Sequence, residues 1–424
     1  MNKSLLLLPL MGMSIAAAAD ATDKPRDWTN TIQDALTVYK SDTTFVQKVK
    51  LAWMEQFQVA DIQPNGSNGL HLKKGASPVN EEFRRSWVGV NVDFSTGTKF
   101  HTWGRIGGLP YRKSYSNGRD IKNYSYTDLF DIWVSQDIKA VKGLTVKAGK
   151  IKPLITTDYS TPSSAIWCVE RSVVGNQFGL DSNWGLDVTY APNKQDKVYV
   201  QLMANDRAST DKNMGHKDIY RDGRGAKGEF GWEDKCFGIV GASHKFHVNE
   251  NGYQAVSAQY GHDFNNVYHH TRKKGANCYG FNTQDIISMG YEYKHGKFHG
   301  LANLVSAFET NAGDGANNIG IQLQPMYTIC PHADLVLRYT GVTGHNSCKL
   351  SADRYVYTQN TATISNKGWV DSINTFYVGV DLYASAINKN AAKIMMGAEY
   401  LTARKGGSDC YNGWEYTTAF RWNF

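Results

Sequence analysis

The side chains of this chain that could act on a solute are basic, and several gather around one segment, residues 153–182. Four of them lie in or next to this segment: Lys147, Lys150, Lys152 and Arg171. Lys and Arg side chains around an aqueous passage attract anions and repel cations. In the alternative interpretation the same cations are neutralised by carboxylates and only hold the segment in place. The carboxylates available for such pairing are Asp131, Asp158, Asp187 and Glu170.

Motifs for catalysis or for a bound metal are missing from the sequence. There is no G-x-S-x-G elbow and no H-E-x-x-H pair, and His269 and His270 are not part of a metal-ligand spacing. The formal net charge of +7 is spread out, without the basic run that is typical of nucleic-acid binding. We therefore predict a protein that is not an enzyme and has neither a cofactor nor a nucleic-acid partner.

The end of the chain shows which elements must carry the basic residues. From Trp414 to Phe424, large apolar side chains alternate with small or polar ones. This period of two residues indicates a β-strand with one apolar face. About ten residues is also the length of a tilted strand that crosses a membrane. Ending on Phe resembles the C-terminal signature of outer-membrane barrels, and the alternative is the last strand of a soluble sandwich.

Strand patterns of this kind recur along the chain about sixteen times, and the connections between them alternate between short and long. Short periplasmic turns and long external loops are typical of outer-membrane barrels. The sequence therefore predicts an all-β fold, a transmembrane antiparallel β-barrel of about sixteen strands. The predicted strands are 43–60, 82–94, 98–107, 127–138, 143–152, 183–190, 196–204, 235–246, 252–264, 283–293, 298–308, 319–329, 333–342, 373–386, 393–403 and 414–424.

Three segments are expected along the chain. Residues 1–19 have the basic start, short apolar core and small-residue end of a secretion signal. Residues 20–42 are expected to be a periplasmic or plugging segment with a short helix that Asp27 caps. Residues 43–424 form the predicted barrel. Apart from the signal, no apolar stretch approaches the roughly eighteen residues of a membrane-spanning helix.

Strand alternation also assigns side chains to faces. Apolar residues such as Val88, Val90, Leu335 and Leu337 are expected to face lipid, which turns their neighbours inward. An Arg on the lipid side near the bilayer midplane would cost about 2–4 kcal/mol. The predicted anion-attracting residues of the lumen are Lys48, Lys50, Arg85, Lys99, His101, Arg105, Lys147, Lys150, Lys152, Arg171, Arg338 and Arg421.

Six cysteines occur at spacings that fit neither a zinc site nor a redox motif. The predicted topology brings Cys348 near Cys410 in neighbouring external loops, and Cys278 near the outer end of the strand that holds Cys236. We predict these two disulfides. Cys168 and Cys330 are the remaining pair, and they are expected to be too far apart to bond.

A family resemblance rests on several stretches. They are Phe83-Arg84-Arg85, the run Gly143-Leu-Thr-Val-Lys-Ala-Gly-Lys-Ile-Lys-Pro153, Val169-Glu-Arg-Ser172, Phe376-Tyr-Val-Gly-Val-Asp-Leu-Tyr383 and Lys393-Ile-Met-Met-Gly-Ala-Glu-Tyr400. Together with the terminal Phe they resemble the phosphate-selective porin O and P family, in patches over most of the predicted barrel. The resemblance implies a sixteen-stranded, usually trimeric channel for anions such as phosphate. Its motif positions fall on Arg85, Lys150, Lys152 and Arg171, although the dense arginine ladder of that family is not found.

A second resemblance, to general porins, concerns one loop. In general porins the loop at the position of residues 153–182 folds into the barrel and narrows it, so these residues are a predicted constriction loop. We therefore expect a porin of the bacterial outer membrane that passes small anionic or neutral solutes by diffusion, surrounded by membrane lipid and, by resemblance, homotrimeric. The alternative is a barrel without an open pore that serves as an anchor or adhesin.

Overall fold

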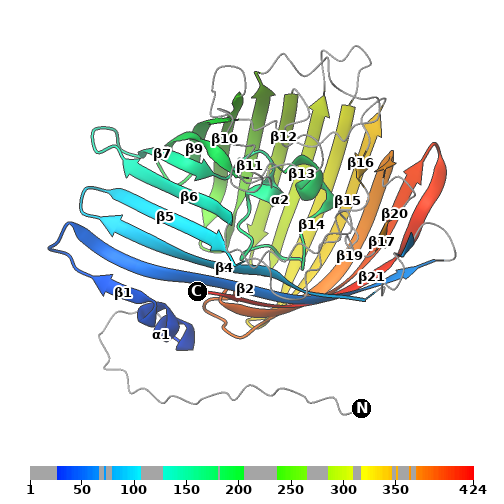
Figure 1. Ribbon diagram of the computed structural model, residues 1–424, viewed down its shortest axis with the longest axis horizontal. Coiled ribbons are helices and arrows are strands. Elements are labelled where there is room, and N and C mark those ends of the chain that lie inside the picture. Colours follow the sequence, from blue (N-terminus) through cyan, green and yellow to red (C-terminus); the bar gives the residue numbers. More distant parts are fainter. Residues whose placement is uncertain are drawn as a thin grey trace.

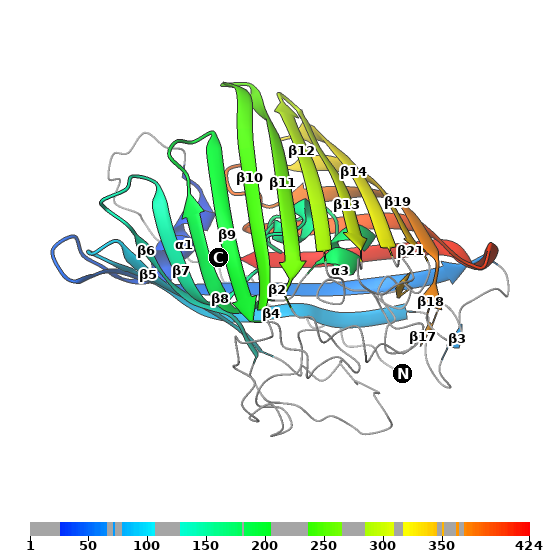
Figure 2. The same cartoon turned by 90° about the horizontal axis from the view of Figure 1, so that it is seen from above.

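The alternation of apolar and polar residues produces long strands that pair into a single sheet. The computed structural model describes residues 26–65, 71–72, 79–106, 128–179, 182–204, 236–264, 285–308, 317–345, 350–351, 362–363 and 369–424. The predicted signal segment lies outside these residues. Sixteen strands form the barrel wall, and the inward part of the chain between β7 and β8 is visible among them in Figures 1 and 2.

The wall strands match the predicted ones closely. They are β2 (Val46–Pro64), β4 (Val79–Phe94), β5 (Thr98–Arg105), β6 (Asp128–Asp137), β7 (Leu144–Ile151), β8 (Asn183–Tyr190), β9 (Asp196–Ala204), β10 (Cys236–Asn249), β11 (Gly252–Asp263), β12 (Asp285–His295), β13 (Phe298–Phe308), β14 (Asn317–Cys330), β15 (Ala333–His345), β19 (Ser372–Tyr383), β20 (Ala392–Lys405) and β21 (Ser408–Asn423). Four two-residue strands, β3 (His71–Leu72), β16 (Leu350–Ser351), β17 (Ala362–Thr363) and β18 (Trp369–Val370), form two small separate sheets.

The sheet closes on itself. Every wall strand is antiparallel to its neighbours in the chain, and the last strand, β21, pairs with the first, β2, from Met54↔Asn423 to Pro64↔Gly413. Closure leaves no open edge, so backbone groups are satisfied within the wall, as a hydrocarbon environment requires. The predicted sixteen-stranded antiparallel barrel is confirmed. Among the described residues, no helix has the length and apolar character needed to cross a membrane.

The outward face is apolar and exposed. Val88, Leu337, Phe376 and Phe420 are each between 43% and 56% exposed, and all four lie on the face that the alternation predicts to contact lipid. The intervening residues point inward, where many of them are buried. Arg421, for example, is 0% exposed although its neighbour Phe420 is 44% exposed.

The last hairpin differs from the prediction. β20 and β21 extend to Lys405 and Ser408 and are joined by Gly406 and Gly407, whose φ angles are +56° and +79°. Two positive φ angles in succession form a tight hairpin that glycine adopts without strain. Consequently Cys410 lies in a strand and not in an external loop.

The N-terminal segment packs against the outside of the barrel, near the C-terminus (Figure 1). Asp27 caps helix α1 (Trp28–Ala35), accepting a hydrogen bond from the backbone N–H of Thr29 at 2.9 Å, as the sequence pattern predicts. Strand β1 (Thr37–Lys40) then pairs with β2 beside the end of β21. The Trp28 ring lies 5.8 Å from that of Trp422, whose side chain is on the outward face. The described part of this segment, residues 26–42, therefore does not plug the lumen.

Candidate functional site: the inward loop and the inner wall

The connection between β7 and β8 enters the barrel as two short helices, α2 (Thr157–Ser160) and α3 (Val173–Phe178), of which α3 contacts β13, β14 and β15. We call residues 153–182 the inward loop; residues 180–181 are not among those described. An interior position is what a constriction loop requires; that the inward loop narrows a passage stays a prediction.

Internal hydrogen bonds give the inward loop a defined shape. The Asp158 carboxylate accepts bonds from the backbone N–H and the hydroxyl of Ser172, both at 2.8 Å. The Ser172 hydroxyl oxygen in turn caps α3 by accepting from the N–H of Gly175 at 2.9 Å. A side chain at Gly175 would not fit, because a Cβ there would lie 2.2 Å from Asp158 Oδ2.

Glu170 is the main anchor of the inward loop. Its carboxylate lies 2.5 Å from Arg84 and 3.1 Å from Arg85, both on β4. Burial by itself would raise the pKa of Glu170, but the two guanidinium groups outweigh it and lower that pKa to about 2. The backbone carbonyl of Glu170 also accepts from Arg338 Nη1 at 2.8 Å, and Arg338 pairs with Glu399 at 3.1 Å.

A second anchor comes from the last two strands. Arg421 donates to the carbonyl groups of Ile166 and Val169 at 3.3 and 3.2 Å. Lys393 donates to the Ile166 carbonyl at 2.8 Å and lies 3.3 Å from Asp381. Hydrogen bonds from charged donors contribute about 1.5–3 kcal/mol each, so the contacts with Ile166 and Val169 fix the loop to the wall. We call Arg85, Arg338, Lys393, Glu399 and Arg421 the docking belt.

For part of the basic residues, the docking belt decides between the two interpretations of the sequence, attraction of anions and structural pairing. Arg85, Arg338 and Arg421 are turned inward as predicted, but they are buried and bonded to the inward loop or to Glu399. The geometry of these three residues therefore fits structural pairing, and not contact with solutes. Lys393 and Glu399 were not singled out from the sequence, although both fall on the inward phase of their strand.

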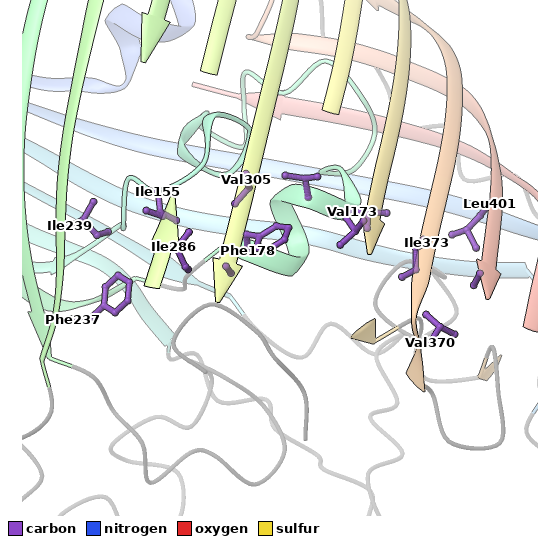
Figure 3. Close-up of a cluster of buried hydrophobic side chains, with 14 of the residues drawn as sticks. Ile155, Val173, Phe178, Phe237, Ile239, Ile286, Val305, Val370, Ile373 and Leu401 are labelled. Atoms are coloured by element: carbon purple, nitrogen blue, oxygen red, sulfur yellow. The ribbon is translucent and has the colours of Figure 1, made fainter. Parts of the chain in front are cut away.

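Apolar contacts also hold the inward loop (Figure 3). Ile155, Val173 and Phe178 of the loop join one buried cluster with inward-facing residues of the wall. The wall residues that Figure 3 labels are Phe237, Ile239, Ile286, Val305, Ile373 and Leu401. An aqueous passage cannot run through this part of the lumen, because well-packed apolar side chains exclude water.

Lys152 and Arg171 bind the inward loop internally. Both cations lie over the Tyr159 ring, at 4.8 and 5.1 Å from its centroid. Lys152 donates to the Thr161 carbonyl at 3.2 Å, and Arg171 donates to the same carbonyl at 2.7 Å and to that of Asp158. Burial and the nearby Arg171 lower the pKa of Lys152 well below its usual range. Their acceptors are carbonyl groups and, for Arg171, also the Ser163 hydroxyl. The pairing with carboxylates in the alternative interpretation is therefore not what holds them.

The short-turn ends of the strands carry a different set of inward cations, which are at least partly exposed. Lys147 lies 4.7 Å from the centroid of the Trp133 ring, Lys197 5.1 Å from that of Tyr199, and Lys245 4.7 Å from that of Tyr253. We call this set the basic arc; its members are Lys48, Lys50, Lys99, Lys147, Lys197, Lys245 and Lys294. The carboxylates on the same described stretch of inner wall are fewer: Asp93, Asp131, Asp137, Asp187 and Glu292.

Three further residues were predicted to line the lumen: Lys150, Arg105 and His101. Lys150 pairs with Ile132 and Trp184 in the sheet, whereas Lys147 pairs with Ser135 and Asp187. Since residues three apart on a strand face opposite sides, Lys150 lies on the outward face and its assignment to the lumen is corrected. The side chain of Arg105 is outside the described part of the structure, and His101 lies inside the barrel as predicted.

Both predicted disulfides stay predictions, because one cysteine of each pair is not described. Cys278 and Cys348 lie outside the described residues. Cys168 and Cys330 are unpaired in the described part of the chain. Cys168 is buried in the inward loop against Val336 and Tyr377. Burial raises its pKa to about 12.

No protein-family model and no curated protein matches this chain. Solved structures do resemble it. The outer membrane channel DcaP of Acinetobacter baumannii has a TM-score of 0.53 at 9% identity, covering 92% of this chain and 100% of its own. OprB of Pseudomonas putida has a TM-score of 0.55 at 11% identity, with 89% and 94% covered. An anion-selective porin from Comamonas acidovorans has a TM-score of 0.52 at 10% identity, with 89% and 99% covered. This likeness shows that the chain has the β-barrel fold of outer-membrane porins.

Proposed function

We propose that this protein is a porin of the bacterial outer membrane, through which small hydrophilic solutes diffuse with a preference for anions. The observation that carries the proposal is the basic arc, a row of partly exposed lysines on the inner wall that outnumber the carboxylates beside them. The inward loop supports it, because it narrows a barrel that would otherwise pass solutes without discrimination. Fixed positive charge along a narrowed passage raises the local concentration of anions.

The proposal can be tested by the zero-current potential of single channels in a KCl gradient. Replacing Lys147, Lys197 and Lys245 by Glu should shift this potential towards cation preference. Lys150→Glu is the control, since it makes the same charge change per residue on the outward face of β7 and should leave the potential unchanged. The shift should shrink at high salt, because screening shortens the reach of the lysines. An unchanged potential in the triple variant would refute anion selection by the basic arc.

Phosphate and the homotrimer are finer proposals that rest on the family resemblance. Phosphate preference predicts that phosphate reduces chloride current more strongly than sulfate does at equal ionic strength. Chemical cross-linking in detergent tests the homotrimer.

One observation favours a second candidate function, a closed barrel that serves as an anchor or adhesin. The apolar cluster around Phe178 and the docking belt are buried inside the barrel. A barrel of this kind would insert into planar bilayers without conductance, which distinguishes it from a porin.

A further inference from the structure

Four rings form a continuous aromatic surface on the inner wall of β4, β5 and β6. The rings of Trp87 and Trp103 are 6.2 Å apart, those of Trp103 and His101 are 6.1 Å apart, and those of His101 and Trp133 are stacked at 4.8 Å. We call these residues the aromatic wall. Neither the docking belt nor the basic arc accounts for them.

The register places the aromatic wall inside the barrel and next to the inward loop. Trp87 pairs with Met54, and His101 pairs with Trp133, so all four side chains are on the inward face. Trp87 is two residues from Arg85, which binds Glu170 of the loop. All four members are partly exposed. A solute that passes along this side of the inward loop would therefore meet these rings.

Glycines face two of the tryptophans across the sheet. Gly89 pairs with Trp103, and Gly149 pairs with Trp133. A Cβ at Gly89 would lie 3.1 Å from Cε3 of Trp103, and one at Gly149 would lie 3.0 Å from Cβ of Trp133. Gly149 also has a φ of +140°, which other residues rarely adopt. The missing side chain at Gly89 leaves room for the Trp103 ring. At both glycines the atom nearest to an added Cβ is a backbone carbonyl oxygen, that of Thr102 at 2.0 Å and that of Ile132 at 2.2 Å, so glycine also permits the close approach of the neighbouring strand.

Hydrogen-bonding groups surround the rings. His101 Nδ1 lies 2.5 Å from Asn91 Oδ1, and its Nε2 lies 3.9 Å from Asp131 Oδ2. The other carboxylate oxygen of Asp131 is buried and has no hydrogen-bond partner among the described residues. The Lys147 ammonium lies over the Trp133 ring. Both donors and acceptors thus lie next to partly exposed aromatic rings.

We propose that the aromatic wall binds the ring of a neutral pyranose sugar during passage; this inference rests on the proposed porin function. The C–H groups on one face of a pyranose carry a small positive charge and stack on the negative face of an indole. Its hydroxyl groups can donate to Asp131 and Asn91 and accept from Lys147. An aromatic carboxylate could stack equally well, but the unpartnered Asp131 oxygen requires a hydrogen-bond donor. A sugar hydroxyl supplies that donor and a carboxylate does not, so the sugar is favoured.

The test is the block of KCl current through single channels by D-glucose, compared with sorbitol. Sorbitol has similar hydroxyl groups but no ring, so it should leave the current noise unchanged while glucose produces resolvable blocking events. Trp103→Ala should weaken the glucose block by about threefold to tenfold, the range expected for one stacking contact. Trp53→Ala is the matched control, since it removes an indole from the outward face. Trp103→Phe, which keeps a ring, should retain most of the block and guards against a folding defect.

The outcomes separate the two proposals. If the channel conducts but glucose and sorbitol act alike, the sugar site is refuted and the porin function stands. Block by benzoate without block by glucose would assign the wall to aromatic anions and overturn the sugar. Absence of conductance would refute the porin function itself.

Discussion

Two parts of the same inner wall carry inward-facing cations, and they differ in what faces them. In the docking belt, Arg421 is 0% and Arg338 3% exposed, and both donate to carbonyl groups of the inward loop. In the basic arc, the lysines are partly exposed and several lie over aromatic rings. Strand alternation turns both sets inward, but only a cation that still meets water can act on a solute. Inward position alone is therefore not enough to assign a residue to a pore.

The strongest test of this comparison is to remove Glu170, the main anchor of the inward loop. Glu170→Ala leaves Arg84 and Arg85 without their carboxylate and should weaken loop docking by about 3–5 kcal/mol. The released loop should raise single-channel conductance and current noise. Asp93→Asn removes a carboxylate of the same strand neighbourhood that does not bind the loop, and should leave the noise unchanged. Equal traces for Glu170→Ala and the unmodified protein would show that the loop is held without this anchor.

Acid should loosen the same anchor without a mutation. The pKa of Glu170 is lowered from 4.5 to about 2, so its contribution is complete above pH 4.5 and is lost as the pH falls towards 2. The full contribution is about 3 kcal/mol. Conductance noise should therefore rise below pH 4.5, and Glu170→Ala should abolish that dependence. A rise that persists in the variant would assign it to other groups.

A smaller effect is expected at the outer contact of α1. Trp28 packs on Trp422 and Phe424, at 5.8 and 5.9 Å between ring centroids, and such pairs contribute about 0.5–1.5 kcal/mol. Trp28→Ala should lower the unfolding temperature of the barrel. This temperature is measured by gel electrophoresis in detergent, as the point at which the band of the folded form, which migrates faster than the unfolded form, is lost. Val38→Ala, at a position 58% exposed, is the control. The same transition temperature in both variants would mean that α1 does not stabilise the closed barrel.

The smallest effect is expected from alkylation of two cysteines, Cys168 and Cys330. Cys168 is buried in the inward loop and its pKa is raised to about 12, so little thiolate forms at pH 8. Cys330 is exposed and should be alkylated by iodoacetamide within minutes, whereas Cys168 should remain unmodified until the barrel unfolds. Mass spectrometry measures both. Rapid modification of Cys168 would show that the loop does not stay packed.

Much of the barrel could be predicted because alternation is a local property. The pattern around Val88 and Leu337 fixes which residues face outward, and the strand spans follow from it. The role of Arg421 could not be predicted in the same way, because it depends on contacts with residues more than two hundred positions away, such as Val169. Lys150 was wrongly assigned to the lumen because the assignment relied on its proximity to the inward loop. The face on which its side chain lies follows instead from its position on β7, three residues after the inward-facing Lys147. The aromatic wall combines three strands, and only their register brings Trp87, His101 and Trp133 together.

The central claim, that part of the inner wall is wet and part is covered by the inward loop, has a direct measurement. In a chain whose native cysteines are replaced by alanine, Ser243→Cys on β10 and Ser288→Cys on β12 place one thiol on each part. Ser243 is partly exposed and Ser288 is 0% exposed. A membrane-impermeant methanethiosulfonate reagent should reduce the current through the Ser243→Cys channel and leave that through Ser288→Cys unchanged. Equal reaction of both thiols, or reaction of neither, would contradict the account.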